Sequence, residues 1–225
     1  MQSLSKSIEQ FINPQYCNSC NAPLSETEQL YCSKCRVNDV QYSKLGNWVL
    51  QLTTHQNLDY AHSFYWFGEV IQAYIHHLKY FGWNAFLPQL INNVVWGIDL
   101  PNEASGAVII PIPLHRIRQR DRGFNQAQVI ASELEQQWNL MVDYEILKRR
   151  KYTKSQTALS ISDMENNMYM AFHLTQTPPK AVLLIDDVLT TGSTADACAR
   201  QLREGGSRWV GVVTLATPKK KKIFR

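Results

Sequence analysis

The stretch that decides the fold runs from Ala181 to Thr194 and reads AVLLIDDVLTTGST. Its first five residues are apolar, which is typical of a short strand buried on both faces of a parallel sheet. Asp186 and Asp187 follow where that strand is expected to end. Beyond the turn, apolar residues recur at helical spacing as far as the glycine pair at 205–206, and residues 209–216 form a second apolar run. The sequence therefore predicts a strand, a loop, a helix and a strand, the βαβ unit of a parallel α/β sheet.

The loop of this unit has the features of an anion site. Ligands of open α/β sheets bind at the carboxyl ends of the strands, where this loop lies. The dipole of the following helix favours negative charge, and Gly192 allows a phosphate to approach the backbone closely. Two adjacent carboxylates would repel a bare phosphate, so they indicate a ligand that also offers hydroxyl groups, a Mg²⁺ ion, or both. The alternative is an ordinary turn in which one hydroxyl caps the helix. The hydroxyl donors are Thr190, Thr191, Ser193 and Thr194.

An apolar run, Asp-Asp, two apolar residues and Thr-Thr-Gly-x-Thr together resemble the phosphoribosyl-pyrophosphate (PRPP) motif of type I phosphoribosyltransferases. This resemblance implies a parallel sheet flanked by helices, in which Asp186 and Asp187 hold the ribose hydroxyls and residues 190–194 wrap the 5-phosphate. It also implies a Mg²⁺ ion bound with PRPP. Purine-salvage enzymes of the superfamily commonly have an aspartate before the Thr-Gly pair. This chain has Thr190 there, which argues against a 6-oxopurine enzyme of the usual kind.

The composition sets further limits. With 225 residues, 44% of them hydrophobic and 19% charged, the chain is long enough for one substantial domain and a small one. Its apolar runs are too short to cross a membrane and its start lacks the apolar core of a signal peptide, so we expect a cytoplasmic protein. The net charge is +4, and the basic residues cluster at 116–122, 148–154 and 219–222, which indicates either polyanion binding or solvated surfaces.

Four cysteines near the N-terminus form a metal-binding pattern. Two Cys-x2-Cys pairs separated by eleven residues suit a tetrahedral zinc site. Disulfides, redox chemistry or an iron–sulfur cluster are the alternatives, and a cytoplasmic chain disfavours the first. Four thiolates leave no open coordination position, so we expect structural Zn²⁺ in a small domain at residues 1–45, followed by the sheet domain at residues 46–225. The expected ligands are Cys17, Cys20, Cys32 and Cys35, whereas Cys198 is expected in the core.

Hydrophobic periodicity predicts further elements around this unit. Strands are expected at residues 58–68, 107–112 and 141–147, and helices at residues 69–80, 84–95 and 124–138. The aromatic residues of the first strand suit either a core or base stacking, and the core is favoured. We expect the arginines of residues 116–122 in the loop after the second strand, and a mobile basic loop at residues 147–160.

Taken together, these stretches resemble the ComF/GntX-type family. The resemblance rests on the four cysteines and on the segments HLKYFG (77–82), PIPLHRIRQRDRGFNQA (111–127), R-x-K-x-T-x-x-Q (149–156) and residues 167–172. That family is a branch of phosphoribosyltransferase-like proteins associated with natural competence, the uptake of single-stranded DNA. It implies PRPP and single-stranded DNA as ligands and other competence proteins as partners. One departure is Met164, three residues before Asn167, where the family has an arginine.

Two functions follow from this resemblance. The first is a PRPP-binding protein that acts on single-stranded DNA during natural transformation. The second is a Mg²⁺-dependent phosphoribosyltransferase that transfers ribose 5-phosphate to an unidentified acceptor, with Asp186 and Asp187 orienting the ribose. The cations expected near the pyrophosphate are Lys79, Arg118, Arg122 and Lys151. Those expected at DNA are Arg116, Arg118, Arg120, Arg122, Arg149, Arg150 and Lys151.

Overall fold

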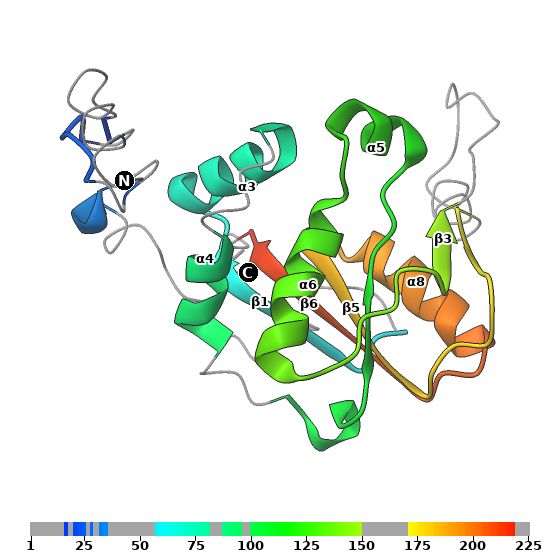
Figure 1. Cartoon of the computed structure of the whole chain (residues 1–225). Helices are drawn as coiled ribbons and strands as arrows, with labels where there is room; N and C mark the ends of the chain where they lie inside the picture. The colour runs from blue at the N-terminus through cyan, green and yellow to red at the C-terminus, as the bar shows by residue number, and fades with distance from the viewer. Residues whose placement is uncertain are drawn as a thin grey trace, which may run out of the picture.

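The computed structural model describes residues 16–17, 20–25, 28, 32–35, 57–81, 87–95, 100–149 and 171–218. Within these ranges, four parallel strands form the main sheet: β1 (Tyr60–Trp66), β6 (Trp209–Thr217), β5 (Ala181–Val188) and β2 (Val108–Pro111), in that spatial order (Figure 1). A separate antiparallel pair consists of β3 (Leu147–Arg149) and β4 (Phe172–Leu174). The predicted parallel sheet is therefore confirmed, and β5 lies in its interior.

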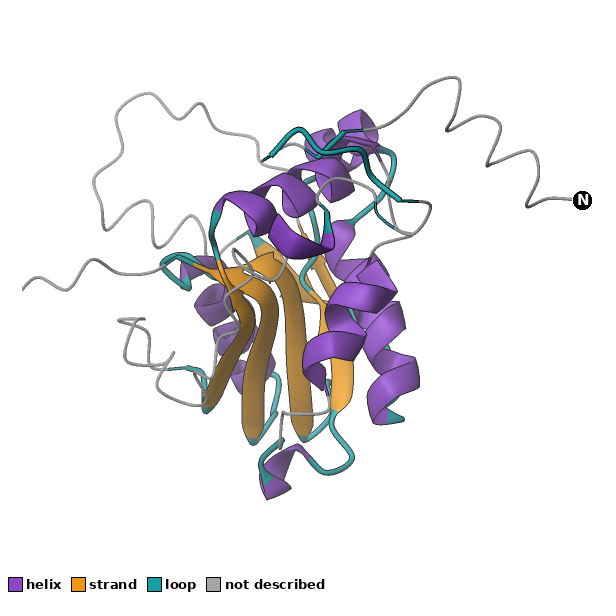
Figure 2. Ribbon diagram, turned by 90° about the vertical axis from the view of Figure 1, so that its left-hand side faces the viewer, coloured by secondary structure: helices purple, strands orange, loops and turns teal. Residues whose placement is uncertain are grey.

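Helices lie on both sides of the main sheet (Figure 2): α3 (Glu69–Phe81), α4 (Leu87–Val95), α6 (Gln126–Trp138) and α8 (Ser193–Glu204), besides a 3-10 turn, η2 (Asn102–Ala104). Leu183 and Ile185 of β5 pack in one hydrophobic cluster with α3, α4 and α6. Val182 and Leu184 point to the opposite face and pack with α8, β3 and β4. All four are fully buried, which explains why the strand is a continuous apolar run. No helix among the described residues is both long enough and apolar enough to cross a membrane.

The aromatic residues of β1 belong to the core. Tyr60, Phe64 and Tyr65 are each at most 5% exposed. The hydroxyl of Tyr65 donates a hydrogen bond to the carbonyl oxygen of Leu90 at 2.5 Å, which ties β1 to α4. Base stacking, the alternative considered from the sequence, is therefore excluded for these three rings.

One buried side chain positions α6 on the sheet. The side-chain oxygen of Asn125 accepts the N–H of Ala127 at 3.1 Å, and its amide donates to the carbonyl oxygen of Ile112 at 3.0 Å. Asn125 therefore caps the helix and also bonds it to the chain that leaves β2. The helix predicted at residues 124–138 starts two residues later because of this cap.

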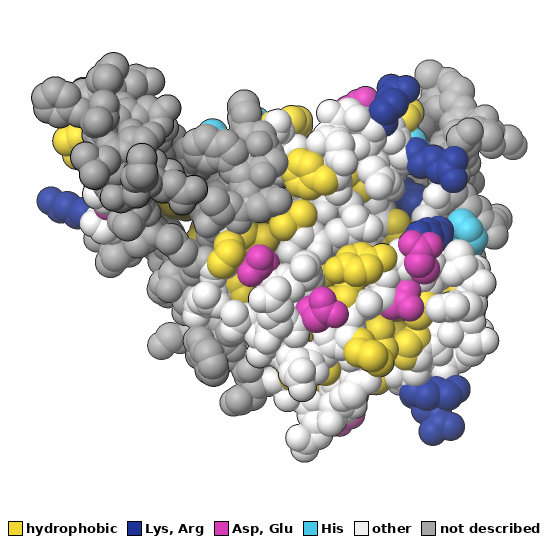
Figure 3. Space-filling view, viewed as in Figure 1, with side chains coloured by type: hydrophobic (Ala, Val, Ile, Leu, Met, Phe, Trp, Pro, Cys, Tyr) yellow, Lys and Arg dark blue, Asp and Glu magenta, His cyan; other side chains and the backbone are white. Residues whose placement is uncertain are grey.

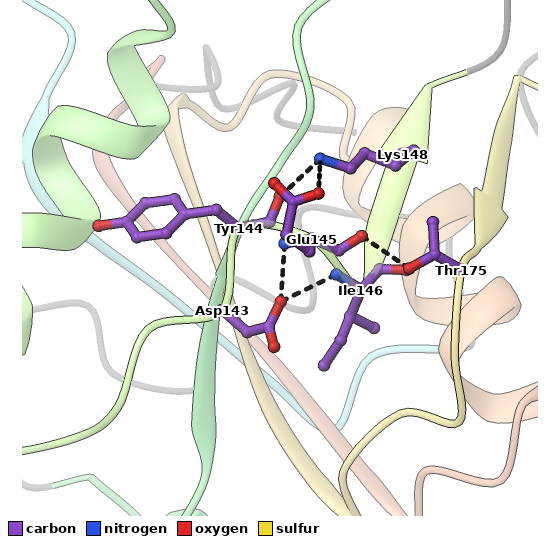
Figure 4. A network of polar contacts seen from close by, with 6 residues as sticks. All are labelled: Asp143, Tyr144, Glu145, Ile146, Lys148 and Thr175. Carbon is purple, nitrogen blue, oxygen red and sulfur yellow. Dashed lines mark hydrogen bonds and ion pairs between the residues drawn. The ribbon is translucent and has the colours of Figure 1, made fainter.

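Residues 141–147 do not form the predicted strand. Val142 makes only a single parallel bridge to Ile109, and a polar network follows before β3 begins (Figure 4). In that network, Oδ1 of Asp143 accepts the N–H groups of Glu145 at 2.7 Å and Ile146 at 2.9 Å. An aspartate that bonds its own downstream backbone replaces the ladder hydrogen bonds of a strand with a turn, so the prediction was wrong here.

Residues 116–122 form a helix, α5 (Arg116–Arg122), where the sequence predicts a loop. Nδ1 of His115 accepts the N–H of Ile117 at 3.3 Å, and Gly123 ends the helix in the left-handed conformation with φ 79°. None of the residues of α5 is buried, and Figure 1 shows the helix standing off the body of the molecule. Because no apolar face packs on the core, the sequence lacks the periodicity by which helices are recognised.

Candidate ligand sites

Asp186 and Asp187 stand at the carboxyl end of β5, where they point to opposite faces of the sheet. Successive side chains of a strand alternate in this way. The carboxylate of Asp187 forms an ion pair at 2.8 Å with Nζ of Lys79, at the end of α3. Asp186 lies on the other face, where Arg149 of β3 and the thiol of Cys198 are close enough to interact with its charge. Cys198 is fully buried, as predicted.

Burial raises the pKa of Asp186 to about 7. The charge of Asp187 acts in the same direction, whereas the backbone N–H of Asp187, 2.8 Å away, and the charges of Lys79 and Arg149 lower that pKa. This carboxyl group is therefore harder to ionise than an ordinary aspartate. A cation or hydroxyl donors bound beside it would favour the ionised form.

The loop after β5 encloses a small cavity at the start of α8. Its volume is about 40 Å³, and it is lined by residues 188–195 together with Asp186. Gly192, with φ 84°, precedes the helix and contributes no side-chain cap, while the N–H of Ser193 donates to Oγ1 of Thr191 at 3.4 Å. The N-terminus of α8 therefore lies at this cavity, where the helix dipole favours an anion. The hydroxyl oxygens of Thr191 and Ser193 lie 2.9 Å apart at this cavity. Hydroxyl groups and a helix N-terminus are donors that suit a phosphate group.

The structure distributes the predicted cations over several places. Lys79 is engaged with Asp187. The guanidinium of Arg122 lies 5.4 Å from the ring centre of Tyr80 and donates to Oε1 of Gln126 at 3.0 Å. Arg116, Arg118 and Arg120 are exposed on α5, Arg149 belongs to β3, and Arg150 and Lys151 lie outside the described residues.

A larger cavity, of about 380 Å³, lies beside β2 at the edge of the sheet. Its walls come from the end of β2 and the loop after it, from α5, from the start of α6, and from Tyr144 together with the β3–β4 pair. Sequence reasoning missed this cavity and did not assign a role to Tyr144, Lys148 or His173. No local motif marks these residues, because the fold assembles the cavity from segments far apart in the chain.

The four predicted cysteine ligands come together. Their Sγ atoms all lie within 4.8 Å of one another, and those of Cys20 and Cys32 are 3.6 Å apart. Zn–S bonds of about 2.3 Å in a tetrahedron place sulfur atoms about 3.8 Å apart, so the cluster fits a zinc ion. All four cysteines, Cys17, Cys20, Cys32 and Cys35, are free thiols, which excludes the disulfide alternative in this structure.

Glu28 joins the two Cys-x2-Cys segments and was not singled out from the sequence. Its carboxylate accepts the backbone N–H of Ser25 at 2.9 Å and also that of Ser33. These two hydrogen bonds lower the pKa of Glu28 to about 2, so the carboxylate stays ionised at neutral pH. Glu28 therefore holds the two segments in register without being needed as a metal ligand.

Comparison with known proteins agrees with this fold. Residues 120–225, just under half of the chain, match the phosphoribosyl transferase domain family. Its relatives are competence and DNA-utilization proteins. It is 38% identical over 112 residues to competence protein F of Haemophilus influenzae, covering 48% of this chain and 49% of that protein. The resemblance predicted from the sequence is thereby confirmed.

Two further relatives show the same extent of similarity. Identity to competence protein ComFC of Bacillus subtilis is 33% over 102 residues, which cover 44% of this chain and 39% of that protein. Identity to the DNA utilization protein YhgH of Escherichia coli O157:H7 is 33% over 118 residues, which cover 52% of this chain and 49% of that protein. The chain thus spans about half the length of the relatives it matches, or less.

Proposed function

We propose that this protein binds PRPP with Mg²⁺ and acts in the cytoplasm on single-stranded DNA taken up in natural transformation, with other competence proteins as partners. The observation that carries the proposal is the meeting of Asp186, Asp187 and the hydroxyl-rich loop of residues 190–194 at the end of β5, where α8 begins. The match to the phosphoribosyl transferase domain supports PRPP as the ligand. The names of the relatives support the link to DNA uptake.

In this proposal, the loop and the N-terminus of α8 hold the 5-phosphate, and the two carboxylates hold the ribose hydroxyls or a Mg²⁺ ion that neutralises phosphate charge. Because the carboxylates point to opposite faces, one ribose can contact both only if Asp187 turns away from Lys79. The ammonium group of Lys79 then becomes available to the pyrophosphate. The ion pair of the ligand-free protein is thus a resting arrangement that PRPP replaces.

The DNA part of the proposal rests on α5. Its arginines are exposed long side chains, and Figure 3 shows Lys and Arg side chains gathered along the side of the molecule that carries α5 and β3. Neutralising DNA phosphates with such side chains releases counterions, and binding therefore weakens as the salt concentration rises.

The test of the PRPP site is calorimetric titration with PRPP in the presence and absence of Mg²⁺. The variant Asp186→Asn, Asp187→Asn is expected to lose at least about 100-fold in affinity, because it removes both carboxylates from the site. The matched control is Glu103→Gln, Glu204→Gln, which removes two exposed carboxylates from η2 and from the last residue of α8. Normal PRPP binding by the double aspartate variant would show that the site is assigned wrongly.

A second candidate function, transfer of ribose 5-phosphate from PRPP to an acceptor, is favoured by the environment of Asp186. A carboxyl group with a pKa of about 7 can accept or release a proton at neutral pH, as acid–base catalysis requires. Incubation with PRPP and Mg²⁺, with and without nucleobases or oligonucleotides, followed by detection of pyrophosphate, separates transfer from binding. Pyrophosphate release that depends on an acceptor identifies a transferase.

We further propose that Zn²⁺ holds residues 1–45 as a small domain, with residues 46–225 forming the phosphoribosyl transferase-like domain. The donor set of four thiols within bonding distance of one metal supports this role. The variant Cys20→Ser, Cys32→Ser is expected to lose one zinc per chain by elemental analysis and to become sensitive to limited proteolysis in residues 1–45. Retention of zinc by this variant would contradict the assignment.

A further inference from the structure

Residues 57–59 lead into β1 and lie along α8, the helix whose first residues line the loop cavity after β5. Figure 1 shows the chain before β1 reaching this helix. Leu58 is buried in the same hydrophobic cluster as Cys198 and Leu202 of α8. Polar contacts to the helix come from Asn57 and Asp59 on either side of it. This entry segment, residues 57–59, is therefore fastened to α8 by both kinds of contact.

Asn57 binds both carboxylate oxygens of Asp196, in the first turn of α8. The backbone N–H of Asn57 donates to Oδ1 at 3.0 Å, and its side-chain amide donates to Oδ2 at 3.0 Å. Two donors from one residue fix the direction of a carboxylate as well as its distance. The charge of Asp196 is thereby held on the flank of the helix that faces the entry segment.

The other end of α8 is bonded to the same segment. Nε of Arg203, in the last turn, donates to the carbonyl oxygen of Asn57 at 2.9 Å, and Nη2 lies 2.5 Å from Oδ2 of Asp59. That oxygen of Asp59 also accepts the N–H of Val210 in β6 at 2.7 Å. Asn57 cannot shift along α8 without breaking these contacts, so its amide is a fixed anchor for Asp196.

The position of Asp196 matters because its charge has the same sign as a phosphate. Asp196 is three residues beyond Ser193, where α8 begins, which corresponds to about 4.5 Å along the helix axis. Helix side chains lean toward the N-terminus, so a carboxylate here points back toward the loop unless a partner draws it aside. Two like charges at such a separation lie within a Debye length of each other and repel.

We propose that Asn57 is a positioning residue of the phosphate site: by holding Asp196 on the flank of α8, it keeps that charge away from the 5-phosphate. The inference rests on the proposed binding of PRPP at residues 190–194, and it adds a residue 139 positions before Asp196 in the chain. Asp196 is absent from the described walls of the loop cavity, which are Asp186 and residues 188–195. A carboxylate that is kept out of the site is expected to lie in this way.

The test is calorimetric titration of the full chain with PRPP and Mg²⁺. Asn57→Ala is expected to weaken binding by about three- to fivefold, because one of the two hydrogen bonds that restrain the charge of Asp196 is lost. Adding Asp196→Asn to this variant should restore the affinity to within twofold of the wild type, because the repelling charge is gone. A merely structural role for Asn57 would not be repaired by a second substitution. The matched control is Asn92→Ala, which removes a side chain bonded to Gln137 on the far side of the sheet's helices and should change binding less than twofold.

Two further measurements separate charge from structure. The loss caused by Asn57→Ala should shrink as the salt concentration rises, because salt screens the repulsion. Asn57→Asp combined with Asp196→Asn keeps an amide opposite a carboxylate but moves the charge from α8 to the entry segment, and this exchanged pair should bind PRPP at least as tightly as the wild type.

Wild-type affinity in Asn57→Ala would overturn the inference, as would a double variant, Asn57→Ala with Asp196→Asn, that binds no more tightly than Asn57→Ala. If circular dichroism shows that Asn57→Ala does not fold, the exchanged pair decides, and an affinity more than twofold below that of the wild type would overturn the inference. Failure of the wild-type chain itself to bind PRPP would instead refute the proposed function on which the inference rests.

Discussion

The carboxyl end of β5 and the helix α5 lie at the same end of the parallel strands, but their charges are held in different ways. At β5, Asp187 is paired with Lys79, and the partly buried Asp186 accepts a backbone hydrogen bond. On α5, no residue is buried, and Arg116 and Arg118 form no ion pair with any described residue. One region has charges engaged by partners, and the other has exposed charges.

This difference separates two kinds of recognition. Charges that are held in place and partly desolvated match the charge pattern of one small ligand, so the binding of that ligand depends weakly on salt concentration. Exposed cations on long side chains adapt to many positions of a polyanion and respond strongly to salt. The carboxyl ends of the parallel strands can therefore carry both a selective ligand site and an unselective polyanion-binding surface.

The largest expected effect concerns the ionisation of Asp186. Its folded-state pKa of about 7 exceeds the unfolded value of 3.8, so the folded chain keeps a proton that the unfolded chain loses between these pH values. The free energy of unfolding should therefore fall as the pH rises from 4 to 7 because of this residue. Urea unfolding at pH 4.5 and 7.5 measures the change.

The control for this prediction is the variant Asp186→Asn, which should lose this pH dependence. His62 acts with the opposite sign, because burial lowers its pKa from 6.5 to about 4, and its contribution to stability rises with pH over that window. The difference between the wild type and Asp186→Asn at each pH therefore isolates the carboxyl group. Equal pH profiles for the two proteins would show that Asp186 ionises normally.

The next largest effect is expected on single-strand binding by the exposed arginines of α5. Arg116→Gln, Arg118→Gln and Arg120→Gln together should weaken single-strand binding by about 10- to 100-fold at low salt. They should also lower the slope of log K against log salt concentration by about 2, since each phosphate contact contributes about 0.7. Anisotropy titrations with dT12 at several salt concentrations measure both quantities. Lys180→Gln, Arg200→Gln and Arg208→Gln together form the charge-matched control, and an unchanged slope in the α5 variant would contradict the contrast.

A smaller effect is expected from Lys79→Met. Loss of the ion pair to Asp187 should cost about 1 kcal/mol of stability, because the pair is only partly buried. PRPP affinity should fall several-fold, since a cation near the pyrophosphate is lost. Urea unfolding and calorimetry measure the two changes, with Lys180→Met as the control. A rise in PRPP affinity would mean that Lys79 competes with the ligand for Asp187.

The smallest effect tests the rigidity of the loop. Gly192→Ala places a side chain at φ 84° and should cost about 1 kcal/mol. Gly106→Ala is the matched control, because Gly106 has φ 71° in an exposed turn and open space for a Cβ atom. Thermal unfolding should fall similarly in both variants, whereas PRPP binding should weaken only in Gly192→Ala. Equal PRPP binding in the two variants would show that the loop adapts freely.

Much of the fold was predictable from local patterns. The apolar run of β5, the helical spacing of α8 and the four cysteines each carry their signal within a short segment. The buried aromatic residues of β1 also behave as their composition predicts. These features depend on burial and spacing, which neighbouring residues in the chain already express.

The remaining features depend on contacts between distant segments. The pairing of Lys79 with Asp187 joins α3 to β5, and no local pattern announces it. The cavity at Tyr144 is lined by three separate stretches of chain, residues 111–128, 144–149 and 173. The helix α5 was missed because its sequence has no buried face. The strand predicted at residues 141–147 does not form, because Asp143 turns the chain. Roles for Arg150 and Lys151 remain predictions.

The bond from Asn125 to the carbonyl oxygen of Ile112 closes the base of the segment that carries α5. The chain leaves the sheet and returns at nearly the same point, so the residues between these two form an excursion whose ends are joined, with Arg122 contacting Tyr80 of α3. Such a segment can be exchanged for another of different charge or length while both anchor points stay where the sheet needs them. The charge that this excursion presents can therefore be changed by substitution without any change to the strands that hold its two ends.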